Sequence, residues 1–251
     1  MRILIVNDDG AHAPGIQALA RQLATGANVT VVAPERQQSA TSHAITLHKP
    51  LHAQRIEISE GIRAFEVNGT PADCVKLALG ALCGQPPNIV VSGVNSGANL
   101  GLDIVYSGTA SAAAEAVLQG IPALAVSLTD APFDFTASVR IAEMLVAQVA
   151  QHGLNERTYL NVNVPPGAYD DLKGIAITRI GVRMYQNAYE QRVDPLGRAY
   201  YWQAGELVKI HNAPDTDVHA VEQGKVSVTP VHFDFTNSIL LATLKEWRLT
   251  L

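Results

Sequence analysis

The sequence predicts an α/β protein whose core is a doubly wound, mostly parallel sheet with helices on both faces. Up to about residue 130, short apolar runs alternate with segments in which apolar residues recur at helical spacing. Strands that alternate with helices form a parallel sheet through right-handed crossovers. With 251 residues, of which 47% are hydrophobic and 16% charged, the chain can bury a core of this kind.

The first apolar run, residues 3–6, is the most informative segment. Four consecutive apolar residues predict a short strand that is buried on both faces. The strand ends in Asn7, Asp8, Asp9 and Gly10. Two adjacent carboxylates repel each other unless a positive group holds them, and a divalent cation is the usual one because hard cations prefer oxygen ligands. Alternatively, these residues only form a turn and cap the next helix.

The other elements of the core follow in order. Pro14 suits the first turn of a helix, and Thr70 with Asp73 forms a cap and an acidic third position around a helix that begins at Pro71. The predicted helices are residues 14–23, 71–82, 109–118 and 136–149. The predicted strands are residues 3–6, 29–33, 62–67, 89–91, 122–128, 159–164 and 175–180, with a short extended segment at 44–47.

The chain changes character beyond about residue 158. Residues 184–202 are polar and aromatic around Asp194-Pro195-Leu196-Gly197, which predicts a β-hairpin arm. Residues 238–249 have helical apolar spacing. Neither segment has enough core of its own, so both are predicted to pack against another subunit in a homodimer or homotetramer. We expect one domain, residues 1–251, with a Rossmann-like core over about 1–180 and the arm and tail over about 181–251.

Composition excludes several classes of protein. The net charge of −5 and the lack of a basic run argue against binding a nucleic-acid polymer. No apolar run approaches membrane-spanning length, and the chain starts directly in a strand, so we expect a cytoplasmic protein. Cys74 and Cys83 lie in one predicted helix at roughly 13 Å, too far apart for a disulfide.

Oxygen-bearing side chains gather in three loops that leave the strands ending near residues 6, 33 and 91. Ligands of open parallel sheets bind at the carboxyl ends of the strands, so these loops should meet. Carboxylates, hydroxyls and amides without a Cys or His cluster favour magnesium, manganese or calcium. The residues concerned are Asn7, Asp8 and Asp9; Ser39, Thr41, Ser42 and His43; and Ser92, Asn95, Ser96, Asn99 and Ser107.

An anion pocket is predicted beside this cation site. Ser107, Gly108 and Thr109 open a helix whose free amides can hold a phosphate, although they also fit a simple helix cap. The chain has neither a dinucleotide-binding glycine pattern, nor a P-loop, nor a serine-hydrolase elbow. A cation site and an anion pocket on one strand edge indicate that a phosphate ester is held for hydrolysis.

Five motifs occur in order along the chain: Asn7-Asp8-Asp9-Gly10, Ala33-Pro34-Glu35 with Gln38-Ser39, Gly69-Thr70-Pro71-Ala72-Asp73-Cys74, Ser92-Gly93-Val94-Asn95 and Tyr106-Ser107-Gly108-Thr109. Together with Asn161-Val162-Asn163-Val164-Pro165 and Tyr201-Trp202, they resemble the survival protein SurE family over essentially the whole chain. The resemblance implies a metal-dependent nucleotidase that acts on nucleoside 5'- and 3'-monophosphates, with exopolyphosphatase activity in some members. Leu102 departs from the family pattern, in which an acid is frequent at this position.

The resemblance also implies roles for individual residues. Asp8, Asp9, Ser39 and Asn95 would bind one divalent cation, Mg²⁺ or Mn²⁺. Asn95 with Ser107, Gly108 and Thr109 would hold the phosphate. For catalysis we select Asp8 and Asn95, with Asp8 orienting or deprotonating a water, while an Asp nucleophile stays open as an alternative. The rival functions are a non-catalytic nucleotide-binding module and a metal-dependent glycosyltransferase.

Overall fold

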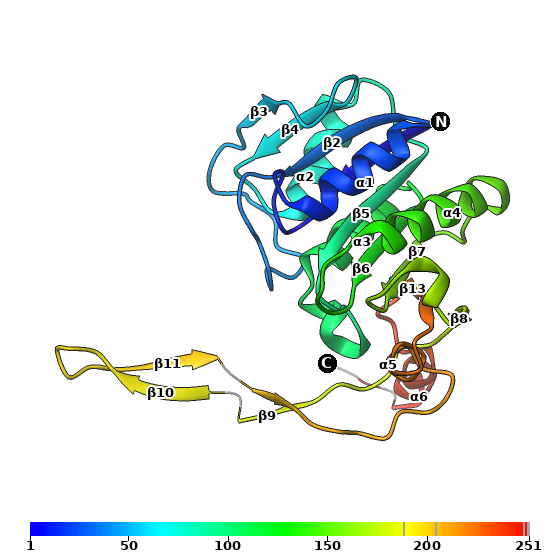
Figure 1. Ribbon diagram of the computed structural model, residues 1–251. Helices are drawn as coiled ribbons and strands as arrows, with labels where there is room; N and C mark the ends of the chain where they lie inside the picture. The colour runs from blue at the N-terminus through cyan, green and yellow to red at the C-terminus, as the bar shows by residue number, and fades with distance from the viewer. Residues whose placement is uncertain (188, 204, 248, 250–251) are drawn as a thin grey trace.

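The computed structural model describes residues 1–187, 189–203, 205–247 and 249. A nine-stranded sheet forms the centre of the molecule (Figure 1). Its strands are β1 (Arg2–Val6), β2 (Asn28–Pro34), β3 (Ala53–Ile56), β4 (Arg63–Val67), β5 (Ile89–Ser96), β6 (Ala123–Leu128), β7 (Thr158–Val164), β8 (Ile175–Ile177) and β13 (Val226–His232). The helices are α1 (Pro14–Ala24), α2 (Pro71–Leu77), α3 (Gly108–Leu118), α4 (Thr136–His152), α5 (Asp217–Glu222) and α6 (Ser238–Glu246).

The strand order, β3-β4-β2-β1-β5-β6-β7-β13-β8, confirms the doubly wound layout. From β1 the chain builds outward through β2 and β4, and then returns to add β5, β6 and β7 on the other side. All neighbours from β4 to β7 run parallel, whereas β3 and β13 are antiparallel to β4 and β7. The winding direction therefore reverses between β1 and β5, and the carboxyl ends of these two strands form the crevice where such sheets bind ligands.

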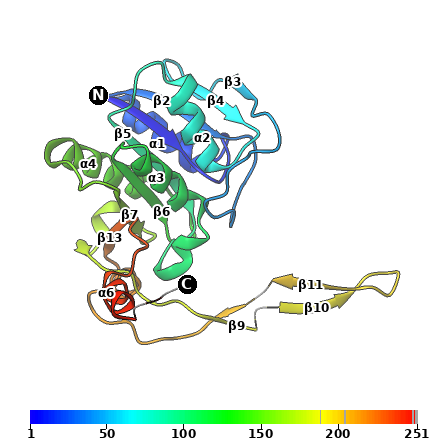
Figure 2. The same ribbon diagram turned by 180° about the vertical axis from the view of Figure 1, so that it is seen from behind.

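Helices cover both faces of the sheet (Figures 1 and 2), and an apolar layer packs between the helices and the sheet on each face. Along β1, Ile3 and Ile5 pack in the layer with α1 and α4, whereas Leu4 and Val6 pack in the layer with α2 and α3. Successive side chains of a strand point to opposite faces, which is why a continuous apolar run is needed here.

Several elements differ from the sequence prediction. The helix expected over 71–82 ends as an α-helix at Leu77 and continues as a π-helical turn, Ala78–Leu82. Residues 44–47 form no strand, and the strand expected over 175–180 ends at Ile177. β5 runs on to Ser96, and the loop expected over 92–108 contains a 3₁₀ helix, η2 (Gly101–Val105). The edge strand β3, the helix α5 and the strand β13 had not been predicted.

The predicted arm is present as two short antiparallel pairs. They are β10 (Tyr189–Val193) with β11 (Ala199–Gln203), and β9 (Tyr185–Gln186) with β12 (Glu206–Leu207). Figures 1 and 2 show the arm reaching away from the sheet, and helix α6 lies near its base. No helix among the described residues is long and apolar enough to cross a membrane.

Candidate functional site

A cavity of about 190 Å³ lies at the crevice between the carboxyl ends of β1 and β5. Five of the seven residues selected from the sequence line it, namely Asp8, Asp9, Ser39, Asn95 and Ser107. The other two, Gly108 and Thr109, lie next to Asp8 at the start of α3. The remaining residues of the lining are Ala40, Ser96, Asn99, Asp103 and Tyr106.

Asp8 is the buried acid of the cavity, with 4% of its surface exposed. Its Oδ1 accepts a hydrogen bond of 2.5 Å from the hydroxyl of Thr109. Burial raises the pKa of Asp8 to about 6, and the charge of Asp9 acts in the same direction, against the hydrogen bonds from Thr109.

The amino terminus of α3 approaches Asp8 closely because residue 108 is glycine. A Cβ at Gly108 would lie 2.6 Å from the Cβ of Asp8 and 2.8 Å from its Oδ2. Ser107 caps the helix by accepting a hydrogen bond of 3.0 Å from the amide of Ala110. Since the Ser107 hydroxyl accepts this bond, its proton stays available for an anion in the cavity. Thr109, which was predicted to bind the phosphate, thus donates its hydroxyl proton to Asp8.

The other selected residues approach from β2 and β5. The amide of Gln38 donates to the carbonyl oxygen of Asp8 at 2.7 Å, which holds the loop after β2 against the end of β1. Ser39 accepts a hydrogen bond of 2.9 Å from Gln37. Asp9 accepts one of 3.0 Å from the amide of Ser96, at the end of β5. The register of β5 against β6 shifts between Ser92 and Asn95, and this irregularity brings Asn95 to the cavity.

The donor set fits a hard divalent cation. In the part of the chain that the structure describes, neither Asp8 nor Asp9 has a basic partner, so the two carboxylates carry uncompensated charge. No three His, Cys, Asp or Glu side chains of the described ranges form a metal cluster. A cation here would therefore need the neutral oxygens of Ser39 and Asn95 beside the two acids.

His43, considered in the sequence because it lies in the second loop, does not line the cavity. Its Nε2 lies 2.8 Å from Oε2 of Glu115, a buried residue of α3. Because an ionised carboxylate only accepts hydrogen bonds, the ring donates. The hydrogen bond from His43 lowers the pKa of Glu115 to about 2, with further contributions from Gln119 and Lys76. The pair fixes the loop that carries Ser39 to the helix that carries Ser107.

Three further residues line the cavity, namely Asn99, which belongs to the oxygen-rich loops predicted from the sequence, and Asp103 and Tyr106, which have no role predicted from it. The backbone of Asn99 is held by two asparagines of β7, since Asn161 and Asn163 both donate to its carbonyl oxygen, at 2.9 and 3.0 Å. The Asn-x-Asn spacing places both amides on one face of β7. From the sequence, the Asn-x-Asn spacing indicates that the two side chains point to the same face, but it does not show that they bind the carbonyl oxygen of Asn99.

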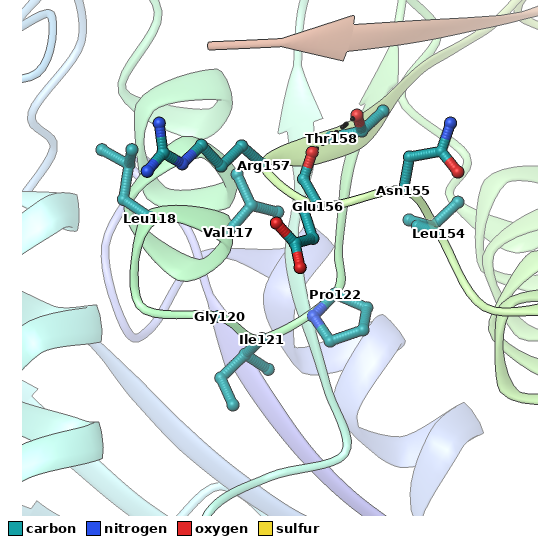
Figure 3. A pocket seen from close by; sticks show the side chains of 10 residues that line it. All are labelled: Val117, Leu118, Gly120, Ile121, Pro122, Leu154, Asn155, Glu156, Arg157 and Thr158. Carbon is teal, nitrogen blue, oxygen red and sulfur yellow. Dashed lines mark hydrogen bonds between the residues drawn. The ribbon is translucent and has the colours of Figure 1, made fainter.

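A larger hollow, of about 300 Å³, opens at the amino-terminal ends of β6 and β7, the opposite edge of the sheet (Figure 3). Figure 3 shows Glu156 and Arg157 beside aliphatic side chains there. None of the oxygen-rich motifs contributes to it, so the cavity at the β1–β5 crevice is the candidate site. The residues that line the hollow are Val117, Leu118, Gly120, Ile121, Pro122, Leu154, Asn155, Glu156, Arg157 and Thr158.

Known proteins match this chain over nearly its full length. The family model described as survival protein SurE matches residues 3–187. A protein of Carboxydothermus hydrogenoformans named 5'-nucleotidase SurE is 49% identical over 253 residues, which cover 98% of this chain and 96% of that protein. Its namesake of Moorella thermoacetica is 50% identical over 239 residues, with coverages of 94% and 92%. The crystal structure of the SurE protein from Aquifex aeolicus has a TM-score of 0.87 at 40% identity, covering 99% of this chain and 100% of that one.

Proposed function

Because this chain belongs to the survival protein SurE family, we propose that it is a metal-dependent 5'-nucleotidase that hydrolyses nucleoside 5'-monophosphates to nucleoside and phosphate. The enzyme class follows from relatives that match nearly the full chain and are named for this activity. The observation that carries the mechanism is the meeting of Asp8, Asp9, Ser39 and Asn95 around one cavity, beside the first turn of α3.

Asp8, Asp9, Ser39 and Asn95 would hold one Mg²⁺ or Mn²⁺ ion. When bound, the cation supplies a Lewis acid that polarises a phosphoryl oxygen and lowers the pKa of a water. Ser107 donates its hydroxyl proton to a phosphoryl oxygen, and Asn95 contributes its amide. Asp8 orients the attacking water and accepts its proton. The water oxygen bonds to phosphorus, the ester bond between phosphorus and the sugar oxygen breaks, and the sugar oxygen leaves as a hydroxyl with a proton taken from solvent.

The size of the cavity bears on which phosphate esters can react. The cavity, of about 190 Å³, is open to solvent, so a nucleotide whose phosphate lies in it would extend over the rim. The base then makes few enclosed contacts, so nucleoside 3'-monophosphates and the terminal phosphate of polyphosphate are proposed as further substrates. We also propose that the protein acts in the cytoplasm as a homodimer or homotetramer.

A substrate panel tests the proposal. Phosphate release is measured from AMP, GMP, 3'-AMP and polyphosphate, each with Mn²⁺, with Mg²⁺ and with chelator. We expect turnover of the 5'-monophosphates with metal and none with chelator. Binding of AMP without phosphate release under every condition would instead make the chain a non-catalytic nucleotide-binding module.

The variant Asp9→Asn tests whether Asp9 binds the metal or only forms a turn. The change removes one of two neighbouring negative charges at nearly constant shape, so the metal-free protein should be as stable as the wild type or slightly more stable. Phosphate release should fall by orders of magnitude, and Mn²⁺ should no longer raise the melting temperature, because that increase comes from binding the native state. Asp170→Asn, which removes an exposed charge outside the cavity, is the control. Metal-dependent turnover retained in Asp9→Asn would remove Asp9 from the site.

A further inference from the structure

The wall of the candidate site contains a third carboxylate, which faces a basic side chain. Asp103 belongs to the 3₁₀ helix η2 and lines the cavity. Its Oδ2 accepts a hydrogen bond of 2.7 Å from Nη1 of Arg183 and one of 2.8 Å from the hydroxyl of Tyr185. The side chains of Arg183 and Asp103 are only 18% and 24% exposed, so water screens the pair weakly. Unlike Asp8 and Asp9, Asp103 is thus electrically compensated.

The position of Arg183 is fixed by buried polar groups. Asp217 is fully buried and accepts hydrogen bonds from the amides of Gly101, at 2.9 Å, and Gly181, at 2.7 Å. Asn212 accepts a third, of 2.8 Å, from the amide of Val182. A Cβ at Gly181 would lie 2.7 Å from Oδ1 of Asn212, so only glycine allows this approach. The buried carboxylate of Asp217 therefore connects Gly101, at the start of η2, to Gly181, which lies two residues before Arg183.

We propose that Arg183 is a positioning residue that neutralises Asp103 and so allows a phosphate dianion to enter the cavity; this inference rests on the proposed function. A phosphomonoester carries close to two negative charges at neutral pH. The cavity already holds the two acids assigned to the cation. If Arg183 did not pair with Asp103, a third negative charge would face the phosphate and weaken its binding.

The two members of the pair should change substrate affinity in opposite directions. In Asp103→Asn the guanidinium of Arg183 stays but is no longer neutralised, so KM for AMP should fall. In Arg183→Met the carboxylate of Asp103 is left uncompensated, so KM should rise. Each change should be about fivefold at low salt, the scale of one charge acting through a partly solvated site. Distortion of the folded site would raise KM in both variants, and an unfolded fraction would lower only the apparent kcat, so opposite changes in KM identify the charge effect.

The double variant Asp103→Asn/Arg183→Met and added salt sharpen the test. The double variant removes both charges and should return KM to within about twofold of the wild type, while the single-variant effects should shrink as salt screens them. kcat should change much less than KM, because Arg183 does not contact the reacting atoms. The exposed pair Arg179–Asp215 supplies controls, Arg179→Met and Asp215→Asn, which should leave KM unchanged.

A binding measurement keeps the inference separate from the proposed function. Inorganic phosphate, added with Mn²⁺, should raise the melting temperature of Asp103→Asn more than that of the wild type, and that of Arg183→Met less. If the wild type releases no phosphate from AMP, the proposed function fails, whatever the variants show. If Asp103→Asn folds and neither KM nor phosphate affinity changes in the expected direction, the inference is overturned, even where Arg183→Met fails to fold.

Discussion

Asp8 combines three features that rarely occur together in a carboxylate. It is almost fully buried, it has a like charge beside it in the chain, and it accepts a hydrogen bond from the first turn of a helix. Burial and the neighbouring charge favour the protonated form, whereas the hydrogen bond favours the ionised form. Burial, a neighbouring like charge and a specific hydrogen bond on one carboxylate are typical of functional sites.

Gly108 is the residue on which the spacing of Asp8 and α3 depends. Gly108→Ala would bring a methyl group within 2.6 Å of the Cβ of Asp8, so the helix or the acid must move. We expect a loss of about 1–3 kcal/mol in the free energy of unfolding and a fall in kcat of at least about 100-fold, since small misplacements of reacting groups cost this much.

Gly80→Ala is the matched control for Gly108→Ala. Gly80 is exposed in the π-helical turn, and a Cβ there would meet nothing within 4 Å. This variant should be as stable as the wild type, or more so because alanine favours helical backbone, and should keep full activity. The free energy of unfolding, measured in urea, and kcat for AMP are compared between the two alanine variants. Equal behaviour of the two alanine variants would mean that the close approach at Gly108 is unimportant.

Among the elements, helix α3 serves two parts of the site. Its first turn contacts Asp8, and Glu115, two turns later, holds His43 of the loop after β2. The hydroxyl of Ser111 in α3 also lies 2.9 Å from the carbonyl oxygen of Ser42 in that loop, the same distance as from the carbonyl oxygens of Ser107 and Gly108. Movement of α3 would therefore displace the anion pocket and the loop with Ser39 together.

The variant Glu115→Gln tests the contact between α3 and the loop after β2, because the stability that Glu115 contributes should depend on pH. The pKa of Glu115 is lowered to about 2, chiefly by the hydrogen bond from His43. In the unfolded chain the pKa returns to its ordinary value of 4.5. The unfolded state then binds more protons, so the stabilisation is complete above pH 4.5 and is lost as the pH falls from 4.5 towards 2. At pH 7 we expect Glu115→Gln to be less stable than the wild type by about 1–3 kcal/mol.

The difference in stability between Glu115→Gln and the wild type should narrow across that acidic window. Urea unfolding at pH 7, 5, 4 and 3 measures it, and Lys76 and Gln119, which also contact Glu115, are left unchanged. Glu60→Gln, which alters an exposed acid, should show no difference at any of these pH values. A difference that stayed constant between pH 5 and pH 3 would show that ionisation of Glu115 is not its origin.

The sequence was most informative where an element has a buried face. The apolar run of β1 and the alternation of strands and helices were sufficient for the doubly wound core. β3 was missed because its four residues are largely exposed, so no apolar periodicity marks it. β13 was missed because Pro230 interrupts its apolar pattern, and a proline argues against a strand inside a sheet.

The same reasoning explains which site residues could be predicted. Asp8, Ser39 and Asn95 each follow or end a strand whose carboxyl end lies at the crevice, so topology alone gathers them. The contact between Asp103 and Arg183 joins residues 80 positions apart, in the 3₁₀ helix η2 and just before the arm. No strand order or helical period relates these two segments, and only the folded chain shows that they meet.

At the scale of the whole molecule, the arm exposes large apolar side chains that no other described part of the chain covers. Tyr189, Val193 and Tyr201 lie on one face of the β10–β11 hairpin and are each more than half exposed. In α6, Ile239 is 85% exposed, and no residue of that helix is buried. A two-stranded hairpin is at best marginally stable alone in water. The hairpin and α6 are therefore the surfaces we propose to lie between subunits.

This proposal predicts at least a dimer at micromolar concentration, measured by analytical ultracentrifugation. Tyr201→Glu places a charge in the centre of the apolar face of the hairpin, where burial against a partner would cost several kcal/mol, so dissociation should become detectable at the same concentration. Gln54→Glu adds the same charge to the exposed edge strand β3, at the other end of the sheet, and should leave assembly unchanged. A wild type that sediments as a monomer would refute the proposed assembly and leave the hairpin without a partner to cover it.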